Sequence, residues 1–278
     1  MAILRLLLFV ALLCGATIPS RPAAAGSTPD LDSIANQLVS HRALYTISVA
    51  RLDPRNYRSG IIGGLSLEFV NACDGFVLNQ RFVIQTDTED GTTLNDMVLN
   101  SWEARDGQSF RFKLKDEVNG DVDQELNGEA VLSGPHRGGV VRFTRPDDTE
   151  LQLPAGILFP TEHTIRLLRL AESGQHWLQA AIYDGSSADG YADVGGFIGV
   201  TLPPETAKRN VLVALKGLRS WRVRLGYFPT EQQQDTPDYE IAYRLYENGV
   251  ADDIVFDYGD YAIRATLARL EVKPRDRC

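Results

Sequence analysis

The sequence predicts an all-β, mainly antiparallel protein, and three observations lead to that fold class. Apolar and polar residues alternate over many short stretches, which is the period of half-buried strands. Asn-Gly and Asp-Gly pairs separate several of these stretches, as tight hairpin turns require. Strands do not alternate regularly with helices along the 278 residues, so βαβ units are not expected. We expect about a dozen strands and two helices.

The N-terminus has the pattern of a cleaved signal peptide. Arg5 precedes an apolar stretch over 6–13, which is too short to cross a bilayer as a stable helix. The three alanines 23–25 follow, and we expect cleavage after Ala25. A lipoprotein anchored at Cys14 is the alternative, although a leucine precedes this cysteine where a lipobox has a small residue. Export of this kind predicts a periplasmic protein.

The expected mature chain, residues 26–278, is strongly acidic. Without Arg5 and Arg21, 26 basic residues remain against 37 acidic ones, and the formal charge falls from −9 to −11. Such a charge repels phosphate backbones and anionic lipid surfaces, so nucleic acid is not an expected partner. No later apolar stretch approaches the length of a transmembrane segment. A chain of this size can fold as one domain.

Two cysteines remain after the expected cleavage, Cys73 and Cys278. An even number of cysteines in an exported protein predicts a disulfide, which would tie the last residue to a site early in the chain. Two free thiols are the alternative. A metal site is disfavoured, because two cysteines without a neighbouring histidine do not provide a tetrahedral ligand set. We expect no cofactor.

The first expected element is a short helix over 31–39, with Asp30 as its cap and Leu31, Ile34 and Leu38 on one face. After this helix the apolar period changes to two. The clearest predicted strands cover 43–49, 65–69, 76–85, 110–114, 177–183, 221–227, 239–245, 254–256 and 261–267.

Turn residues recur between these stretches. A type I′ turn needs positive φ at both central residues, which Asn, Asp and Gly accept at low cost. The recurrence favours an antiparallel meander. The expected turns are Asp74-Gly75, Asp90-Gly91, Asp106-Gly107, Asn119-Gly120, Asn127-Gly128, Gly138-Gly139 and Asn248-Gly249.

A second helix is expected over 161–173, where it interrupts the strands. Thr161 can cap it, and Ile165, Leu168 and Ala171 form its apolar stripe. A glycine follows the stripe and ends the helix. This is the longest helical pattern in the mature chain.

Candidate catalytic groups are few. The sequence contains no Gly-x-Ser-x-Gly, no His-x-x-x-His and no Cys-x-x-Cys, which are the patterns of common hydrolases and redox centres. His41, His136, His163 and His176 stand at strand, turn or helix ends, where local backbone hydrogen bonds explain them better than catalysis. We therefore expect a protein that is not an enzyme, with a hydrolase of unfamiliar pattern as the alternative.

A loop rich in Gly, Ser and Asp is expected over 184–196. Asp184, Asp189 and Asp193 offer three carboxylates there, but their irregular spacing and the lack of a glutamate do not fit a calcium loop. We interpret the segment as a solvated turn.

Arg222 and Arg224 occupy the polar face of one predicted strand. A solvated charged face is the simplest interpretation, and a docking stripe for an acidic partner is the alternative. The apolar faces of the strands leave a further question open. They either interdigitate into a closed core or curl around a cleft that holds an acyl chain.

Several motifs, in the same order along the chain, resemble those of the EipB-like family of periplasmic cell-envelope integrity proteins. The resemblance runs from about residue 38 to 278. It rests on Ser40-His41-Arg42-Ala43-x-Tyr45, Ser109-Phe-Arg-Phe112, Leu153-Pro-Ala-Gly-x-Leu-Phe-Pro-Thr161, His163-Thr164, Asn248-Gly249-Val250 and Asp257-Tyr-Gly-Asp260.

The resemblance implies a β-spiral, a long and strongly bent antiparallel sheet of about fourteen strands around one helix, similar to Lol-type lipoprotein carriers. It also implies that Cys73 and Cys278 form the family's disulfide. The implied role is to maintain the envelope of a Gram-negative bacterium without catalysis, by binding a protein or a lipid-linked partner. A carrier of lipids or lipoproteins, with an apolar concave face, is the alternative function.

Overall fold

The computed structural model describes residues 30–53, 58–134, 137–204, 210–230 and 235–274. Two α-helices, one 3-10 helix and fourteen strands make up this part of the chain. The helices are α1 (Leu31–Gln37), α2 (Pro160–Glu172) and η1 (Asn210–Leu215). The strands are β1 (His41–Leu52), β2 (Arg58–Asn71), β3 (Gly75–Thr88), β4 (Gly91–Ala104), β5 (Ser109–Val118), β6 (Asp121–Leu132), β7 (Gly139–Arg145), β8 (Glu150–Leu153), β9 (Trp177–Ile182), β10 (Ala192–Thr201), β11 (Ser220–Pro229), β12 (Tyr239–Tyr246), β13 (Ala251–Asp257) and β14 (Tyr261–Val272).

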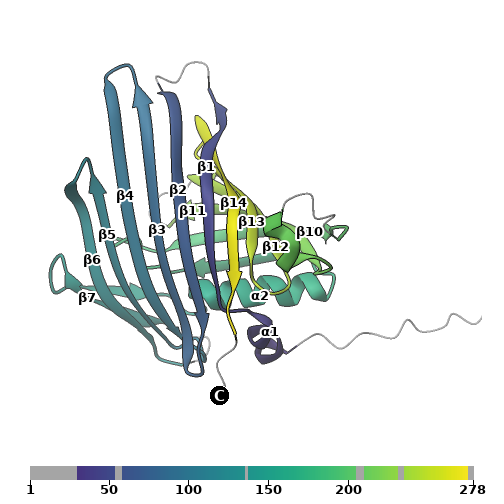
Figure 1. Cartoon of the computed structure of the whole chain (residues 1–278). Coiled ribbons are helices and arrows are strands. Elements are labelled where there is room, and N and C mark those ends of the chain that lie inside the picture. Colours follow the sequence, from purple (N-terminus) through teal and green to yellow (C-terminus); the bar gives the residue numbers. More distant parts are fainter. Residues whose placement is uncertain (1–29, 54–57, 135–136, 205–209, 231–234, 275–278) are drawn as a thin grey trace, which may run out of the picture.

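All fourteen strands form one antiparallel sheet, which confirms the predicted fold class. The spatial order is β8-β7-β6-β5-β4-β3-β2-β1-β14-β13-β12-β11-β10-β9 (Figure 1). The sheet therefore consists of two meanders, β1–β8 and β9–β14, which join where β1 pairs with β14. Neighbours in the sequence are neighbours in space within each meander, as short hairpin connections require.

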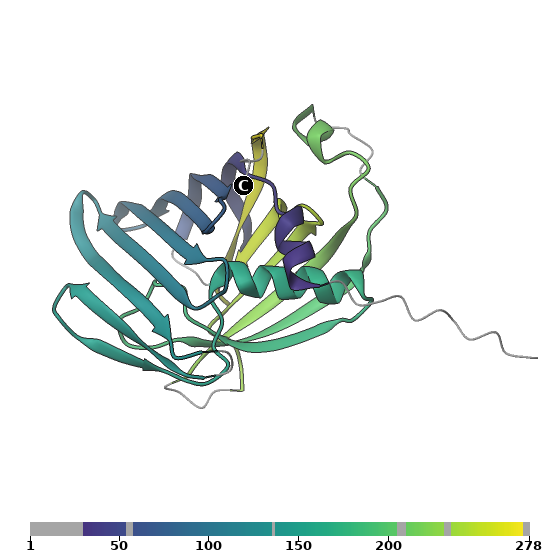
Figure 2. The same cartoon turned by 90° about the horizontal axis from the view of Figure 1, so that it is seen from below.

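The sheet bends around α2, which lies inside the curve with α1 beside it (Figure 2). The segment after β8 runs along the edge of β9. There the Leu158 N–H donates to the Ala181 oxygen (2.9 Å), and the Leu158 oxygen accepts from the Tyr183 N–H (3.1 Å). Leu158 thus pairs with the outer edge of β9 at one isolated bridge.

Most of the predicted turns are confirmed. Asn119 and Gly120 connect β5 to β6 with φ of 56° and 91°, the positive values of a type I′ turn. Gly249, with φ of 85°, turns the chain between β12 and β13.

The prediction of a turn at Asn127-Gly128 is wrong, because both residues lie inside β6. Gly128 is needed there for close packing and not for a turn. A Cβ at this position would come within 2.7 Å of the Phe112 ring and 2.8 Å of the Arg142 oxygen. Glycine in a strand often marks such a close approach.

The helix α2 begins at Pro160, one residue before its predicted start. Thr161 does not cap it. The carboxylate of Glu103, on β4, accepts hydrogen bonds from the N–H groups of Thr161 and Glu162, both at 2.7 Å. A carboxylate at this end satisfies free N–H groups and lies favourably in the field of the helix dipole. Asp30 likewise makes no side-chain hydrogen bond that caps α1.

Three clusters of buried apolar residues lie on the concave side of the sheet. The first packs α1 and α2 against β9–β12, with Trp221 only 2 % exposed. The second lies between β1, β2 and β12–β14. The third joins β4–β8 to the segment before α2, where the Phe110 and Phe159 rings stack at 5.2 Å. Each fully buried large side chain stabilises the fold by roughly 1.5–3 kcal/mol.

The loop predicted over 184–196 is shorter than expected. Its last five residues belong to β10, which starts at Ala192. The glycines of this strand allow α2 to approach, since a Cβ at Gly196 would meet Leu225 at 3.1 Å and Leu167 at 3.3 Å. Within the described residues, no helix is long and apolar enough to span a membrane.

Candidate functional site: a charged hollow on the outer face

Two histidines form hydrogen bonds with backbone oxygens, as expected from the sequence. The His41 ring lies 2.8 Å, through Nδ1, from the Val39 oxygen, and burial lowers its pKa. The His176 ring contacts the Ile198 oxygen in the same way, also at 2.8 Å. Both rings hold backbone in place.

The other two histidines differ. His163 is buried on α2, and its Nε2 has no hydrogen-bond partner among the described residues. Burial, with a smaller contribution from Arg166, lowers the pKa of His163 to about 4, so its ring is neutral at pH 7. His136 lies outside the described residues.

The acidic segment that follows β9 is a turn stabilised by its own hydrogen bonds. Asp184 accepts from the N–H of Ser186 (3.0 Å) and from its hydroxyl (2.6 Å), and the Asp189 N–H donates to the Ser187 hydroxyl (3.1 Å). Asp193 is exposed on β10. In the described part of the chain, no three metal-ligating side chains come together. The hydrogen bonds of Asp184 and Asp189 confirm that this segment is a turn.

Arg222 and Arg224 lie on the exposed face of β11, and each has a carboxylate partner. Arg222 pairs with Asp253 at 2.5 Å and Arg224 pairs with Glu240 at 2.8 Å. These pairs confirm a solvated charged face. Both guanidinium groups are thus in ion pairs within the sheet, and the alternative of a docking stripe on β11 stays a prediction.

Cys73 lies in the turn between β2 and β3. Cys278 is outside the described residues, and its pairing with Cys73 stays a prediction.

A hollow of about 530 Å³ lies on the outer face of β14, β1, β2, β3 and β4. Ala43 and Tyr45 are buried in the core, so the alternating residues Arg42 and Leu44 face away from α2. We call this surface the outer hollow. Its lining residues are Arg42, Ala43, Leu44, Ser66, Leu67, Glu68, Asn79, Gln80, Arg81, Val98, Asn100, Arg269 and Glu271.

Cross-strand ion pairs fix part of the outer hollow. Arg42 lies opposite Glu68 in the register of β1 and β2, and their side chains pair at 3.0 Å. Lys273 also binds Glu68, and these two cations lower the pKa of the Glu68 carboxyl. Arg81 on β3 donates two hydrogen bonds to the carboxylate of Asp96 on β4. Exposed pairs of this kind contribute little stability, but they order the side chains.

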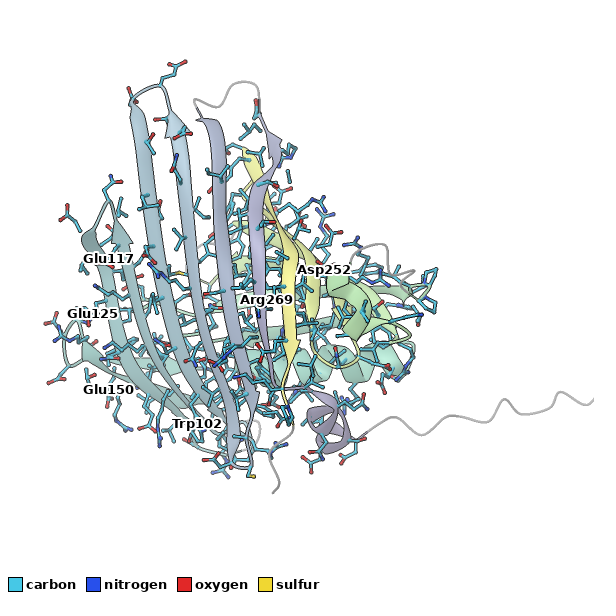
Figure 3. All side chains as sticks on the ribbon, in the orientation of Figure 1. Trp102, Glu117, Glu125, Glu150, Asp252 and Arg269 are labelled. Carbon is cyan, nitrogen blue, oxygen red and sulfur yellow. The ribbon has the colours of Figure 1, made fainter. Side chains whose placement is uncertain are left out.

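Two charges of the outer hollow have no ion-pair partner in the described part of the chain. Arg269, on β14 next to β1 (Figure 3), forms no ion pair there, nor does Glu271 two residues later. Between Arg269 and Ser66 the register places Leu44, which is 47 % exposed. The outer hollow therefore presents one free charge of each sign around an exposed apolar side chain.

The outer hollow is not evident from the sequence, because each of its strands, taken alone, has an ordinary polar face. The sequence feature that could have indicated it is the set of polar residues that alternate with apolar ones in the predicted strands over 43–49, 65–69 and 76–85. Only the strand order shows that these faces adjoin, and that β14 adds Arg269 and Glu271 to them.

The concave side retains a cavity of about 170 Å³ between α2 and strands β1–β3 and β13. Leu38, Leu67, Phe69 and Leu78 supply most of its apolar walls, and the His41 ring also lines it. Sites for drug-sized ligands have about 300–1,000 Å³, so this cavity is small for an acyl chain.

A single bent sheet around one helix defines a barrel-like β protein. The chain belongs to the EipB-like family, whose model matches residues 32–274, and the predicted resemblance is confirmed. Over 262 residues it is 32% identical to the cell envelope integrity protein EipB of Brucella abortus, covering 93% of this chain and 92% of that protein. A crystal structure of a beta-barrel-like protein of a domain of unknown function, also from Brucella abortus, superposes with a TM-score of 0.79 and 32% identity, over 85% of this chain and 99% of that one.

Proposed function

We propose that this protein is an exported, non-enzymatic periplasmic protein that maintains envelope integrity by binding an envelope protein or a lipid-linked partner. The observation that carries the proposal is the outer hollow, where Arg269 and Glu271, which form no ion pair with any described residue, lie beside exposed Leu44. Free charges of both signs favour a protein segment of mixed charge over a polyanion, since charge complementarity selects partners and fixes their orientation. Arginine is also enriched among the residues that dominate the binding energy of protein interfaces.

The proposal that the protein is not an enzyme rests on the environments of its histidines. His41 and His176 are engaged with backbone oxygens, and buried His163 stays neutral because burial lowers its pKa to about 4. A general base needs a pKa near the operating pH and access to a substrate. The EipB-like family name, likewise, does not denote an enzyme.

The alternative function, a carrier of lipids or lipoproteins, has less support. A carrier needs an apolar cavity of several hundred Å³, whereas the cavity beside α2 has about 170 Å³. Three clusters of buried apolar residues also lie on the concave side.

The position of the C-terminal segment supports the proposed disulfide. The Lys273 N–H donates to the Ser40 oxygen (2.7 Å), and the Ser40 hydroxyl accepts from the Asn71 N–H (3.0 Å). Lys273 therefore lies near Asn71, the last residue of β2, and Cys73 follows Asn71 by two residues. We therefore propose that the residues after Lys273 bring Cys278 to Cys73.

The test of the proposed function replaces Leu44 by aspartate in a strain that lacks the native gene. We expect Leu44→Asp to abolish rescue of growth on detergent, because a buried unpaired carboxylate would oppose docking at the outer hollow. The matched control is Val200→Asp on β10, where an apolar side chain 74 % exposed receives the same charge. The Val200→Asp variant should rescue growth as well as the parent protein does when both are present at equal levels. Full rescue by Leu44→Asp would count against docking there.

A further inference from the structure

The two outer edges of the sheet, β8 and β9, differ in how they are protected. β8 is a strand of four residues, which carries Glu150 in an ion pair with Arg142 and is followed by Pro154. Short length, charge and proline are common devices against pairing with another chain. β9 has the sequence Trp-Leu-Gln-Ala-Ala-Ile, without a charged residue or a proline. Its edge is therefore unprotected by these devices.

The backbone groups of β9 point alternately to β10 and away from the sheet, as in any antiparallel strand. The Ala181 oxygen and the Tyr183 N–H point away from β10, because both form hydrogen bonds with Leu158 at the outer edge. β9 pairs with β10 without a register shift. The N–H and C=O groups of Trp177 and Gln179 therefore point outward as well.

These outward groups are open to a partner. Trp177 and Gln179 are exposed, and in the part of the chain that the structure describes no hydrogen bond reaches their N–H or C=O groups. The bridge of Leu158 occupies only the C-terminal end of β9. We call the outward backbone groups of Trp177 and Gln179 the free edge. A row of free N–H and C=O groups at the edge of a sheet matches the backbone of an extended chain.

Two exposed aromatic side chains lie beside the free edge. Trp177 and Phe197 are opposite each other on β9 and β10, and they are 58 % and 54 % exposed. The Trp177 ring lies over Gly195 on β10, since a Cβ there would come within 3.1 Å of it. The ring therefore leans away from the free edge and leaves it uncovered. Its exposed surface can contact an apolar side chain of an added strand.

The charge beside the free edge is negative. Asp193, on β10, is exposed and lies opposite Ala181. Asp184 follows β9 by two residues. Neither carboxylate has an ion-pair partner among the described residues, and β9 itself contributes no charge. Charge complementarity therefore favours a basic segment over an acidic one.

We propose that the free edge of β9 binds an extended, basic segment of another protein by strand addition. The N–H and C=O groups of Trp177 and Gln179 pair with the backbone of this segment. The Trp177 ring contacts one of its apolar side chains, and Asp193 provides the opposite charge. The outer hollow is formed by β14 and β1–β4, so this inference stands or fails separately from the proposed function.

The test measures binding of a blocked hexapeptide, Lys-Val-Thr-Val-Thr-Lys, to the mature protein by calorimetry. Binding should be saturable, with a Kd of about 1 mM or lower. The same peptide with every backbone nitrogen methylated cannot donate backbone hydrogen bonds, so it should bind at least about tenfold more weakly. A peptide with glutamate in place of both lysines should also bind at least about tenfold more weakly, because its charge has the wrong sign.

Hydrogen–deuterium exchange, resolved to single residues, locates the bound peptide. In the free protein the N–H groups of Trp177 and Gln179 should exchange faster than that of Leu178, which points toward β10. Saturating peptide should slow the exchange of both outward groups by at least about tenfold. A peptide bound elsewhere on the surface would leave these two rates unchanged.

Two substitutions of one residue separate the backbone from the side chain. Gln179→Pro removes an outward N–H at a position where edge strands tolerate proline, and it should weaken peptide binding by about tenfold or more. The matched control, Gln179→Ala, keeps the N–H and should bind the peptide as the parent does. If Gln179→Pro does not fold, Trp177→Ala is the second variant, with an expected loss of about tenfold from the missing apolar contact.

No saturable binding, equal binding of the methylated or the glutamate peptide, or unchanged exchange at Trp177 and Gln179 would overturn the proposal. Full binding by a folded Gln179→Pro variant would overturn it as well. Slow exchange of both N–H groups in the free protein, together with sedimentation as a dimer, would show that a second copy occupies the free edge and would also overturn it.

Discussion

Replacing Glu103 by alanine is expected to lower the free energy of unfolding by about 2–4 kcal/mol. Glu103 is 2 % exposed, and its carboxylate is the acceptor for two N–H groups at the start of α2. Removing a buried acceptor costs about 1–3 kcal/mol for each donor left unsatisfied, and loss of a helix cap alone costs about 1 kcal/mol. Relief of the buried charge offsets part of this loss.

The effect should depend on pH. Burial raises the pKa of Glu103 to about 7, against the opposing effect of the N–H groups of Thr161 and Glu162. A carboxyl whose folded pKa lies above its unfolded value contributes stability below about pH 4.5, and this contribution is lost as the pH rises through 7. His163 has the opposite sign, because its lowered pKa makes the folded state lose stability as the pH falls from about 6.5 toward 4.

A comparison of variants isolates Glu103 from the histidines. Urea unfolding should show that Glu103→Gln lowers the free energy of unfolding by about 1 kcal/mol less at pH 8 than at pH 6. The reason is that only the parent must ionise a buried carboxyl over this range. Glu129→Gln is the control, because its carboxylate lies in an exposed pair with Arg111. An equal effect of Glu103→Gln at both pH values would show that this carboxyl does not titrate between them.

Cys278→Ser is expected to destabilise the protein by up to about 5 kcal/mol if the proposed bridge closes a loop of about 206 residues, as the chain-entropy relation gives. Native strain subtracts from that limit. The measurement is the melting temperature of oxidised parent, reduced parent and variant, with the thiols counted by alkylation and mass spectrometry. Reduced parent and Cys278→Ser should melt alike and below the oxidised parent. Two alkylated thiols in the untreated protein would identify free cysteines.

Strands with one buried and one exposed face were predictable from the sequence. The residues of β1 alternate between buried and exposed over its first eight positions, and β5 alternates similarly. In contrast, β4 and β6 are partly buried on both faces, so their sequences lack a clear period of two. The glycine-rich sequence of β10 was interpreted as part of a loop. The contact with α2 that requires glycine there depends on the tertiary structure.

The candidate sites could be predicted only in part. The acidic turn was visible in the sequence, but the outer hollow joins the polar faces of five strands, and which faces adjoin depends on the sheet order. The cap of α2 was missed for a similar reason, since Glu103 precedes Thr161 by 58 positions. Local patterns identify elements, whereas these contacts join elements that are distant in the sequence.

The most direct test of partner binding at the outer hollow is photo-crosslinking in living cells. A benzophenone amino acid replaces Leu44 in the outer hollow or, as the control, Val200 on β10, both exposed apolar positions. We predict one discrete adduct from position 44, identified by mass spectrometry as an envelope protein or an acylated protein, and no such adduct from position 200. Equal crosslinking at both positions, or none from position 44 in a protein that still rescues envelope integrity, would contradict docking at the outer hollow.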